Sequence, residues 1–223
     1  MGPVIGNILP LALGIAISPI PIIAAILMLL SPRARSTSVG FLLGWVLGII
    51  VAVGVFTLLS SVLPEKDPDA SQPIAGWIKI AIGALLLLLA LKQWRGRPRE
   101  GEQAALPGWM SAIDSMTAVR AAGLGFVLSA VNPKNLLMAA GAGVIVGSAG
   151  LDGGAIVLSL AIFVVIAAAS VAVPVIAYLV AAPAMEAPLE RLRVWLQQNN
   201  STVMAVLLLV IGVVMVGKGI ASF

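Results

Sequence analysis

The sequence predicts an all-α integral membrane protein with six transmembrane helices, built as two inverted three-helix repeats. The first supporting observation is composition: 61% of the 223 residues are hydrophobic and only 10% are charged. A soluble domain carries about 25% charged residues, so lipid must cover much of this surface. The second observation is a set of six separate apolar runs, and the third is a likeness between the first and fourth of them.

The apolar runs define the expected spans. A bilayer core about 30 Å thick requires about 20 apolar residues in a helix. The runs cover residues 4–30, 39–63, 74–91, 121–149, 155–182 and roughly 201–217. No positive charge precedes the first run, which is also too long for a secretory signal peptide, so we expect a retained helix there.

One long connection divides the chain. The boundaries we expect are 1–223 for a single membrane domain, 1–91 and 121–223 for its two halves, and 92–120 for a cytoplasmic linker. Within the linker, Trp109, Ile113 and Met116 would share one face of a short interfacial helix. An irregular loop is the alternative.

The distribution of positive charge predicts the orientation. Connections on the cytoplasmic side carry an excess of Lys and Arg. The odd-numbered connections hold Arg33, Arg35, Lys92, Arg95, Arg97, Arg99, Arg120, Arg191 and Arg193, against Lys66, Lys79 and Lys218 on the other side. We therefore expect a multi-pass protein of the inner (plasma) membrane with both termini extracytoplasmic. Trp77 and Trp94 bracket the third span as interfacial anchors.

The first and fourth runs share a short match and then a break. Residues 13–18 (LGIAIS) align with residues 124–129 (LGFVLS), and Pro19 and Pro21 or Pro133 follow. Each broken run opens a half of three spans, and an odd number of spans inverts the second half relative to the first. Unwound backbone is tolerated in a bilayer only where it is buried or lines a cavity, so the breaks indicate a binding site.

Lys134 is the strongest candidate for chemistry. It lies near the middle of the fourth run, about 20 Å along a helix from either end, where a lysine cannot reach the membrane surface. A lone ammonium at the bilayer centre costs at least about 2.5–3.5 kcal/mol. We interpret it as an anion-binding or proton-titrating group in a translocation path, with a structural clamp on broken backbone as the alternative.

Polar residues and prolines surround Lys134 and the matched break. Asn132 and Asn135 would contact substrate or cap the half-helix that starts near Pro133. Ser18 would bond carbonyls freed by the prolines, although a plain kink is the alternative. The predicted substrate-binding or translocation residues are Ser18, Pro19, Pro21, Ser129, Asn132, Pro133, Lys134 and Asn135.

Two further residues and several absences complete the site prediction. Asp114 is either a solvated helix cap or a gate partner for Arg120 or Lys134. The sequence has no His and no Cys, and the six runs contain no Asp or Glu. Metal-ion transport, a metal site and a cofactor are therefore not expected, and we predict no catalytic residues.

A family resemblance rests on these same residues. The run 123–135, which ends in SAVNPKN, resembles the fourth-helix signature of the actinobacterial GAP family of glycolipid-addressing proteins. Residues 18–21 (SPIP) are similar to its first-helix motif, and segments 94–98, 107–109 and 113–114 also fit. The Asn-Pro-Lys tripeptide and the proline-rich first helix also resemble the wider lysine-exporter superfamily.

The resemblance implies six helices and export of a cell-envelope lipid or glycolipid. The leading alternative is an exporter of a small amphipathic solute such as an amino acid. A membrane-embedded enzyme is disfavoured because a Ser–His pair, a His-metal cluster and paired intramembrane carboxylates are all missing. The expected partner is membrane lipid or glycolipid, not nucleic acid. A homo-oligomer and association with a larger lipid transporter both remain open.

Overall fold

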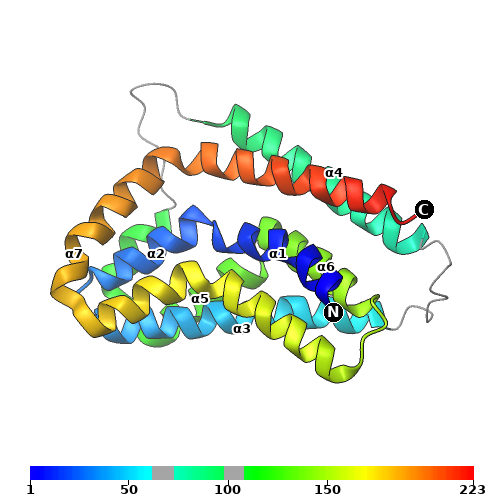
Figure 1. The fold of residues 1–223 in the computed structure, drawn as a ribbon. Coiled ribbons are helices and arrows are strands. Elements are labelled where there is room, and N and C mark those ends of the chain that lie inside the picture. The colour runs from blue at the N-terminus through cyan, green and yellow to red at the C-terminus, as the bar shows by residue number, and fades with distance from the viewer. Residues whose placement is uncertain (62–72, 98–107) are drawn as a thin grey trace.

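A computed structural model of the chain describes residues 1–61, 73–97 and 108–223, with the side chains of residues 61, 73, 75, 109, 111, 114 and 183 left out. The described part is helical and contains no strand. Figure 1 shows the order of the helices. They are α1 (Gly2–Ala16), α2 (Pro19–Leu29), α3 (Ala34–Ser61), α4 (Pro73–Arg95), the 3₁₀ helix η1 (Gly108–Ser115), α5 (Ala118–Ala130), α6 (Pro133–Gly147) and α7 (Gly153–Ile220).

The helices identify a multi-pass membrane protein. In the described residues, four helical segments are long and apolar enough to cross a bilayer: Ala34–Ser60, Gly76–Arg95, Gly153–Ala182 and Ala184–Ile220. The last two are parts of α7, which leaves helical geometry at Ala181 (φ −141°, ψ 51°), two residues before Pro183. The pair α1 and α2, bent by 51°, makes a fifth span if it counts as one.

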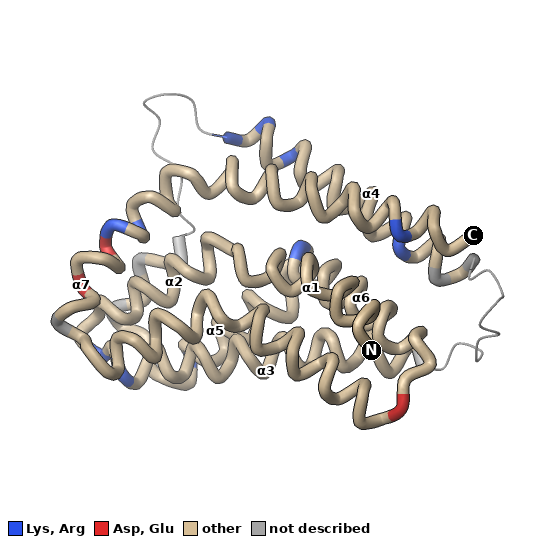
Figure 2. The backbone as a smooth tube through the Cα atoms, in the orientation of Figure 1, with Lys and Arg blue, Asp and Glu red and all other residues tan. Residues whose placement is uncertain are grey.

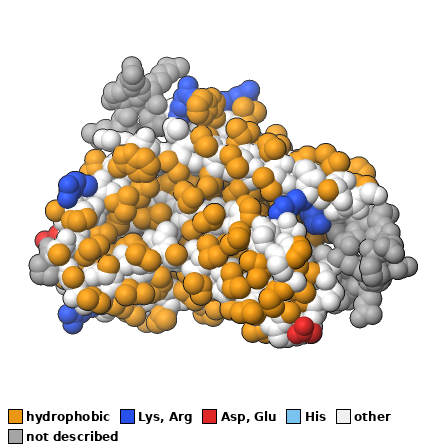
Figure 3. Space-filling model, in the orientation of Figure 1, with side chains coloured by type: hydrophobic (Ala, Val, Ile, Leu, Met, Phe, Trp, Pro, Cys, Tyr) orange, Lys and Arg blue, Asp and Glu red, His pale blue; other side chains and the backbone are white. Residues whose placement is uncertain are grey.

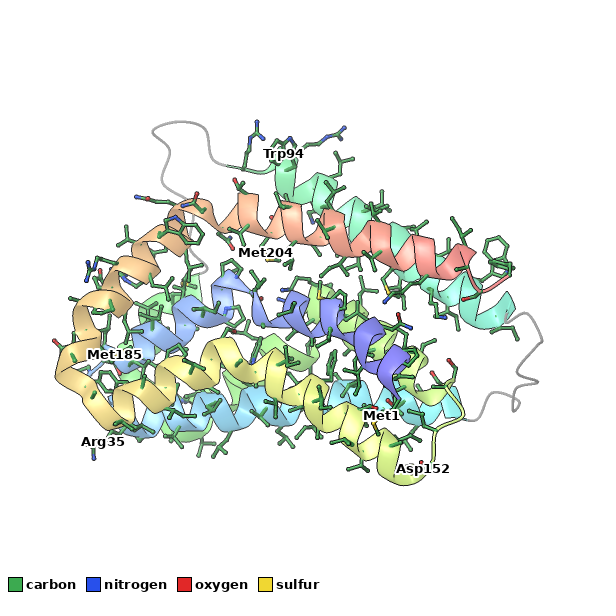
Figure 4. All side chains as sticks on the ribbon, viewed as in Figure 1. Met1, Arg35, Trp94, Asp152, Met185 and Met204 are labelled. Atoms are coloured by element: carbon green, nitrogen blue, oxygen red, sulfur yellow. The ribbon has the colours of Figure 1, made fainter. Side chains whose placement is uncertain are left out.

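The chain termini and the helix connections lie at the two ends of the bundle. Both chain termini lie at the same end (Figure 1), and the labelled Met1 and Asp152 lie there too. Arg35 and Met185 lie at the opposite end (Figure 4). Figure 2 shows charged positions at the bend of α7, along α4 and near the chain termini, with one basic position in the middle of the bundle near α1. The placement of termini and connections at the two ends is the one that a membrane imposes on a helical bundle.

Glycines on α3 allow α5 to approach its backbone closely. Gly40, Gly44 and Gly48 repeat every fourth residue and therefore lie on one face of α3. A Cβ atom at Gly44 would lie 2.6 Å from the carbonyl carbon of Ala122 on α5. Small residues at such a seam maximise van der Waals contact, which is the main force between helices in lipid. The α3–α5 seam therefore holds the start of the fourth apolar run in place.

A second glycine seam joins α4 to the last part of α7. A Cβ atom at Gly83 would lie 2.9 Å from the carbonyl oxygen of Gly212, and one at Gly212 would lie 3.1 Å from the oxygen of Gly83. Gly76 and Gly219 make the same reciprocal approach, at 3.1 and 2.9 Å. The two helices therefore run antiparallel, with matching glycines face to face.

The linker contains a short helix that packs against protein. The sequence predicted an interfacial helix or an irregular loop within 92–120, and η1 occupies residues 108–115 of it. Met110 and Ile113 are buried in the core, and Met116 packs against it. The side chain of Trp109 lies outside the described part of the chain, so of the predicted face only Ile113 and Met116 are described.

Candidate functional site

The first break leaves backbone carbonyls without their usual donors. α1 ends at Ala16 and α2 begins at Pro19. The Ser18 N–H donates to the oxygen of Ala16 at 2.8 Å, so it does not donate to Gly14 four residues back. Proline has no N–H, so Pro19 and Pro21 likewise donate to neither Ile15 nor Ile17. Three carbonyls, those of Gly14, Ile15 and Ile17, thereby lose their i+4 partners at one place.

The second break lies between α5 and α6. α5 is closed by Val131, whose N–H donates to the oxygen of Val127 at 3.0 Å. Asn132 has an extended conformation (φ −61°, ψ 122°), as expected before proline. Its Oδ1 accepts from the Lys134 N–H at 3.1 Å, and Pro133 occupies the first turn. Asn132 therefore caps α6, which is one of the two roles its sequence position allowed.

Lys134 joins the two breaks. Its Nζ donates to the carbonyl oxygen of Gly14 at 2.7 Å, across 120 residues of sequence. The side chain is only 3% exposed. The acceptor is one of the carbonyls opened by the first break, at the C-terminal, partly negative end of α1. The hydrogen bond thus joins the start of α6 to the end of α1.

Asn135, the residue after Lys134, carries a buried acceptor. Its side chain is fully buried, and its Nδ2 donates to the oxygen of Leu128 at 2.9 Å. Among the described residues no donor reaches its Oδ1. A buried amide oxygen without a partner is costly, so native proteins keep few of them. The amide is therefore oriented by α5 and keeps one oxygen open.

The two serines occupy different positions relative to the breaks. Ser18 is buried and is the N-cap residue of α2, although its hydroxyl makes no capping bond. Ser129 lies inside α5, where its hydroxyl donates to Gly125 and Phe126 carbonyls at 2.9 and 3.0 Å. The residue that occupies the position of Ser18 at the second break is Asn132, three residues after Ser129. The sequence match is therefore offset from the structural breaks by almost one helical turn.

The two residues predicted as a possible gate, Asp114 and Arg120, lie before and at the start of α5. Arg120 is exposed in the first turn of α5, at the end of that helix away from the break. Its backbone N–H, not its side chain, bonds the capping Thr117. The side chain of Asp114 lies outside the described part of the chain. Pairing of Asp114 with Arg120 or Lys134 therefore stays a prediction, and the acceptor that the described residues give Lys134 is the backbone carbonyl of Gly14.

The site is rich in acceptors and has one cation. An ammonium has three donors, and the described residues accept one of them. Residues next to Gly14 and Lys134 in the sequence add acceptors: the carbonyls of Ile15 and Ile17, which lack their i+4 donors, and the Oδ1 of Asn135. In residues 1–61, 73–97 and 108–223, no three His, Cys, Asp or Glu side chains gather as metal ligands would. The arrangement suits recognition of a polar group through hydrogen bonds.

Sequence reasoning did not identify Gly14 as a site residue. Its oxygen is the acceptor for Lys134, and a Cβ atom there would lie 2.5 Å from the sulfur of Met138 on α6. The glycine therefore lets α1 approach α6 closely enough for the bond. The available signal was its place in the LGIAIS match, four residues before Ser18.

Comparison with known proteins identifies one family. A family model described as "Sap, sulfolipid-1-addressing protein" matches residues 8–221, which is nearly the whole chain. Neither a curated protein nor a solved structure matches the chain.

Proposed function

The chain belongs to the sulfolipid-1-addressing protein family, and from this premise we propose that it is a membrane exporter, or export accessory, for a cell-envelope lipid or glycolipid. The observation that carries the proposal is the bond between Lys134 and Gly14. It connects two interrupted helices through a buried charge. Interrupted helices at matched positions are where transporters bind cargo, and buried charges in membranes mark pathways.

The proposed architecture has six crossings in two inverted halves. In it, α5 and α6 together form a broken crossing like that of α1 and α2. The antiparallel packing of α4 against the last part of α7 supports this plan, because inversion of the second half turns its third span antiparallel to the third span of the first half. The shared end for both termini fits an even number of crossings (Figure 1). With the excess of positive charge on the odd-numbered connections, that end is extracytoplasmic in the plasma membrane.

The chemistry of the site favours a headgroup that carries hydroxyl groups. A sugar hydroxyl donates to the Oδ1 of Asn135 or to the open carbonyls of Ile15 and Ile17, and accepts from Lys134. In the absence of cargo, the ammonium of Lys134 rests on the oxygen of Gly14. When cargo binds, the ammonium of Lys134 donates to the cargo in place of the Gly14 oxygen, which loosens the connection between the halves. The lipid tails pass sideways between helices.

Substitution of Lys134 tests the proposal. Lys134→Met keeps the length of the side chain and removes its charge and donors. It leaves the Gly14 oxygen unpaired, at a cost of about 1–3 kcal/mol, and removes a buried charge that costs about 2.5–3.5 kcal/mol. The two changes nearly cancel, so the variant should reach the membrane at wild-type levels. Transport should nevertheless be abolished, and Lys134→Arg should rescue it only in part.

The measurement is transport of labelled lipid by purified protein in liposomes at equal protein levels. Lys92→Met, which removes an exposed lysine from the last turn of α4, is the matched control and should transport normally. Wild-type transport by Lys134→Met would reject the central site. Movement of lipid by the isolated protein would also reject a pure scaffold that recruits a larger lipid transporter.

The second candidate function is export of a small zwitterion such as an amino acid. The specific observation in its favour is that one ammonium, on Lys134, lies beside open carbonyls. The carboxylate of an amino acid would accept from the ammonium of Lys134, and its amino group would donate to the open carbonyls. The two functions separate in one assay, because an amino-acid exporter would release a labelled amino acid from liposomes and leave lipid distribution unchanged.

A further inference from the structure

Two lysines lie together where α4 crosses the end of α7. Lys79 is in the second turn of α4, and its Nζ donates to the hydroxyl of Ser222 at 3.1 Å. That hydroxyl donates to the carbonyl of Lys218 at 2.9 Å. The Nζ of Lys218 donates to the carbonyl of Asn7 on α1, also at 2.9 Å. Both lysines are half-buried and are held on neutral oxygens by three segments of the chain.

This pair of charges is not neutralised within the described residues. The ion pair found there, between Arg193 and Glu190, lies elsewhere on α7. The described residues give each ammonium one oxygen acceptor, so each retains two free donors. Half-buried like charges destabilise the fold unless an anion joins them. The pair also lies on the side where the positive-inside pattern predicts few cations.

The surroundings of the lysines are those of a membrane interface. Trp77, 63% exposed, packs edge-on against Phe223 with ring centroids 5.3 Å apart. Ile220, 62% exposed, lies on the same turn of α7 as Lys218. Figure 3 shows basic side chains among hydrophobic ones where α4 begins and α7 ends. Tryptophan and phenylalanine at this level would flank lipid tails, with the cations at the headgroups.

We propose that Lys79, Lys218 and Ser222 bind the phosphate or sulfate headgroup of an anionic lipid, at a site separate from the one at Lys134. The two ammonium groups each donate to the oxyanion, and the hydroxyl of Ser222 turns from the Lys218 carbonyl to a third oxygen. The site lies seven residues nearer the start of α1 than Gly14, about 10 Å along that helix. It does not depend on the proposed export function.

Native mass spectrometry of the purified protein in detergent tests the site. The probes are phosphatidylglycerol, zwitterionic phosphatidylcholine and inorganic phosphate. A Lys near an anionic lipid surface contributes about a factor of five in affinity, so two contribute about thirtyfold. Lys79→Gln with Lys218→Gln should weaken phosphatidylglycerol binding by about that factor. Lys79→Arg with Lys218→Arg should retain most of it.

The control variant removes the same charge at the other end. Arg33→Gln with Arg35→Gln neutralises two exposed cations of the first connection and should leave binding at this site unchanged. Single Lys79→Gln, expected to weaken binding about fivefold, serves if the double variant is unstable. Equal binding of phosphatidylglycerol by wild type and these variants would overturn the proposal. Equal binding of phosphatidylcholine or inorganic phosphate would overturn the assignment to an anionic lipid.

Discussion

A methyl group added at Gly44 should loosen the bundle at the α3–α5 seam. The Cβ of Gly44→Ala would lie 2.6 Å from the carbonyl carbon of Ala122 and 2.8 Å from its Cα. Both atoms are backbone, so neither can rotate away, and the two helices must separate. Overpacking of this kind costs about 1–3 kcal/mol. Against it, alanine is a better helix former than glycine by about 1 kcal/mol.

Gly54→Ala on the same helix separates these two effects. No atom lies within 4 Å of a Cβ at Gly54, so this variant gains the helix propensity without a clash. The difference between the two variants therefore isolates the clash, and we expect Gly44→Ala to be less stable by about 1–3 kcal/mol. Unfolding by sodium dodecyl sulfate in mixed micelles, followed by far-ultraviolet circular dichroism, measures it. Equal stability of the two variants would refute the close approach of α3 and α5.

Three further predictions concern topology and the site. The sequence has no cysteine, so an impermeant thiol reagent should label Gly2→Cys in intact cells and Arg35→Cys only after lysis; the reverse pattern would reject the orientation. Asn132→Ala should lose about 1 kcal/mol of stability by removing the cap of α6, and Asn132→Asp should retain it; thermal unfolding in detergent would detect the difference. Pro19→Ala with Pro21→Ala should supply donors to the open carbonyls, which raises stability and lowers transport; unchanged transport in liposomes would separate the break from function.

The apolar runs predicted the helices well because bilayer thickness imposes a length. The predicted run at 39–63 became α3, and the run at 74–91 became α4. The last two runs also form helix, but α7 continues through the connection between them. A connection outside the bilayer need not be apolar, so hydropathy marks the end of the membrane and not the end of the helix. The two helical breaks fell within the first and fourth runs, where Pro19 and Pro133 begin the second helix of each pair.

Contacts between helices were harder to read from the sequence. The glycine repeat at residues 40, 44 and 48 is typical of close helix packing in membranes, but the sequence does not indicate which helix packs against it. Lys134 was recognised from its position alone, yet its partner Gly14 acts through a backbone carbonyl. Every residue has a backbone carbonyl, so the type of a residue does not indicate that its carbonyl accepts a hydrogen bond. Ser18 and Ser129 align in sequence but differ in structure for a similar reason: whether a residue caps a helix depends on where that helix begins, which the alignment does not indicate.

The clamp and transport interpretations of Lys134 are compatible on energetic grounds. A charged hydrogen bond such as that to Gly14 contributes about 1.5–3 kcal/mol. A lysine at the bilayer centre costs about 2.5–3.5 kcal/mol. The bond therefore offsets much of the cost without a large surplus, and its loss in exchange for a polar headgroup is nearly neutral. In the proposed export function, a deep energy minimum would hold α1 and α6 together permanently, whereas a balanced contact would hold them while the site is empty and release them when cargo supplies equivalent partners.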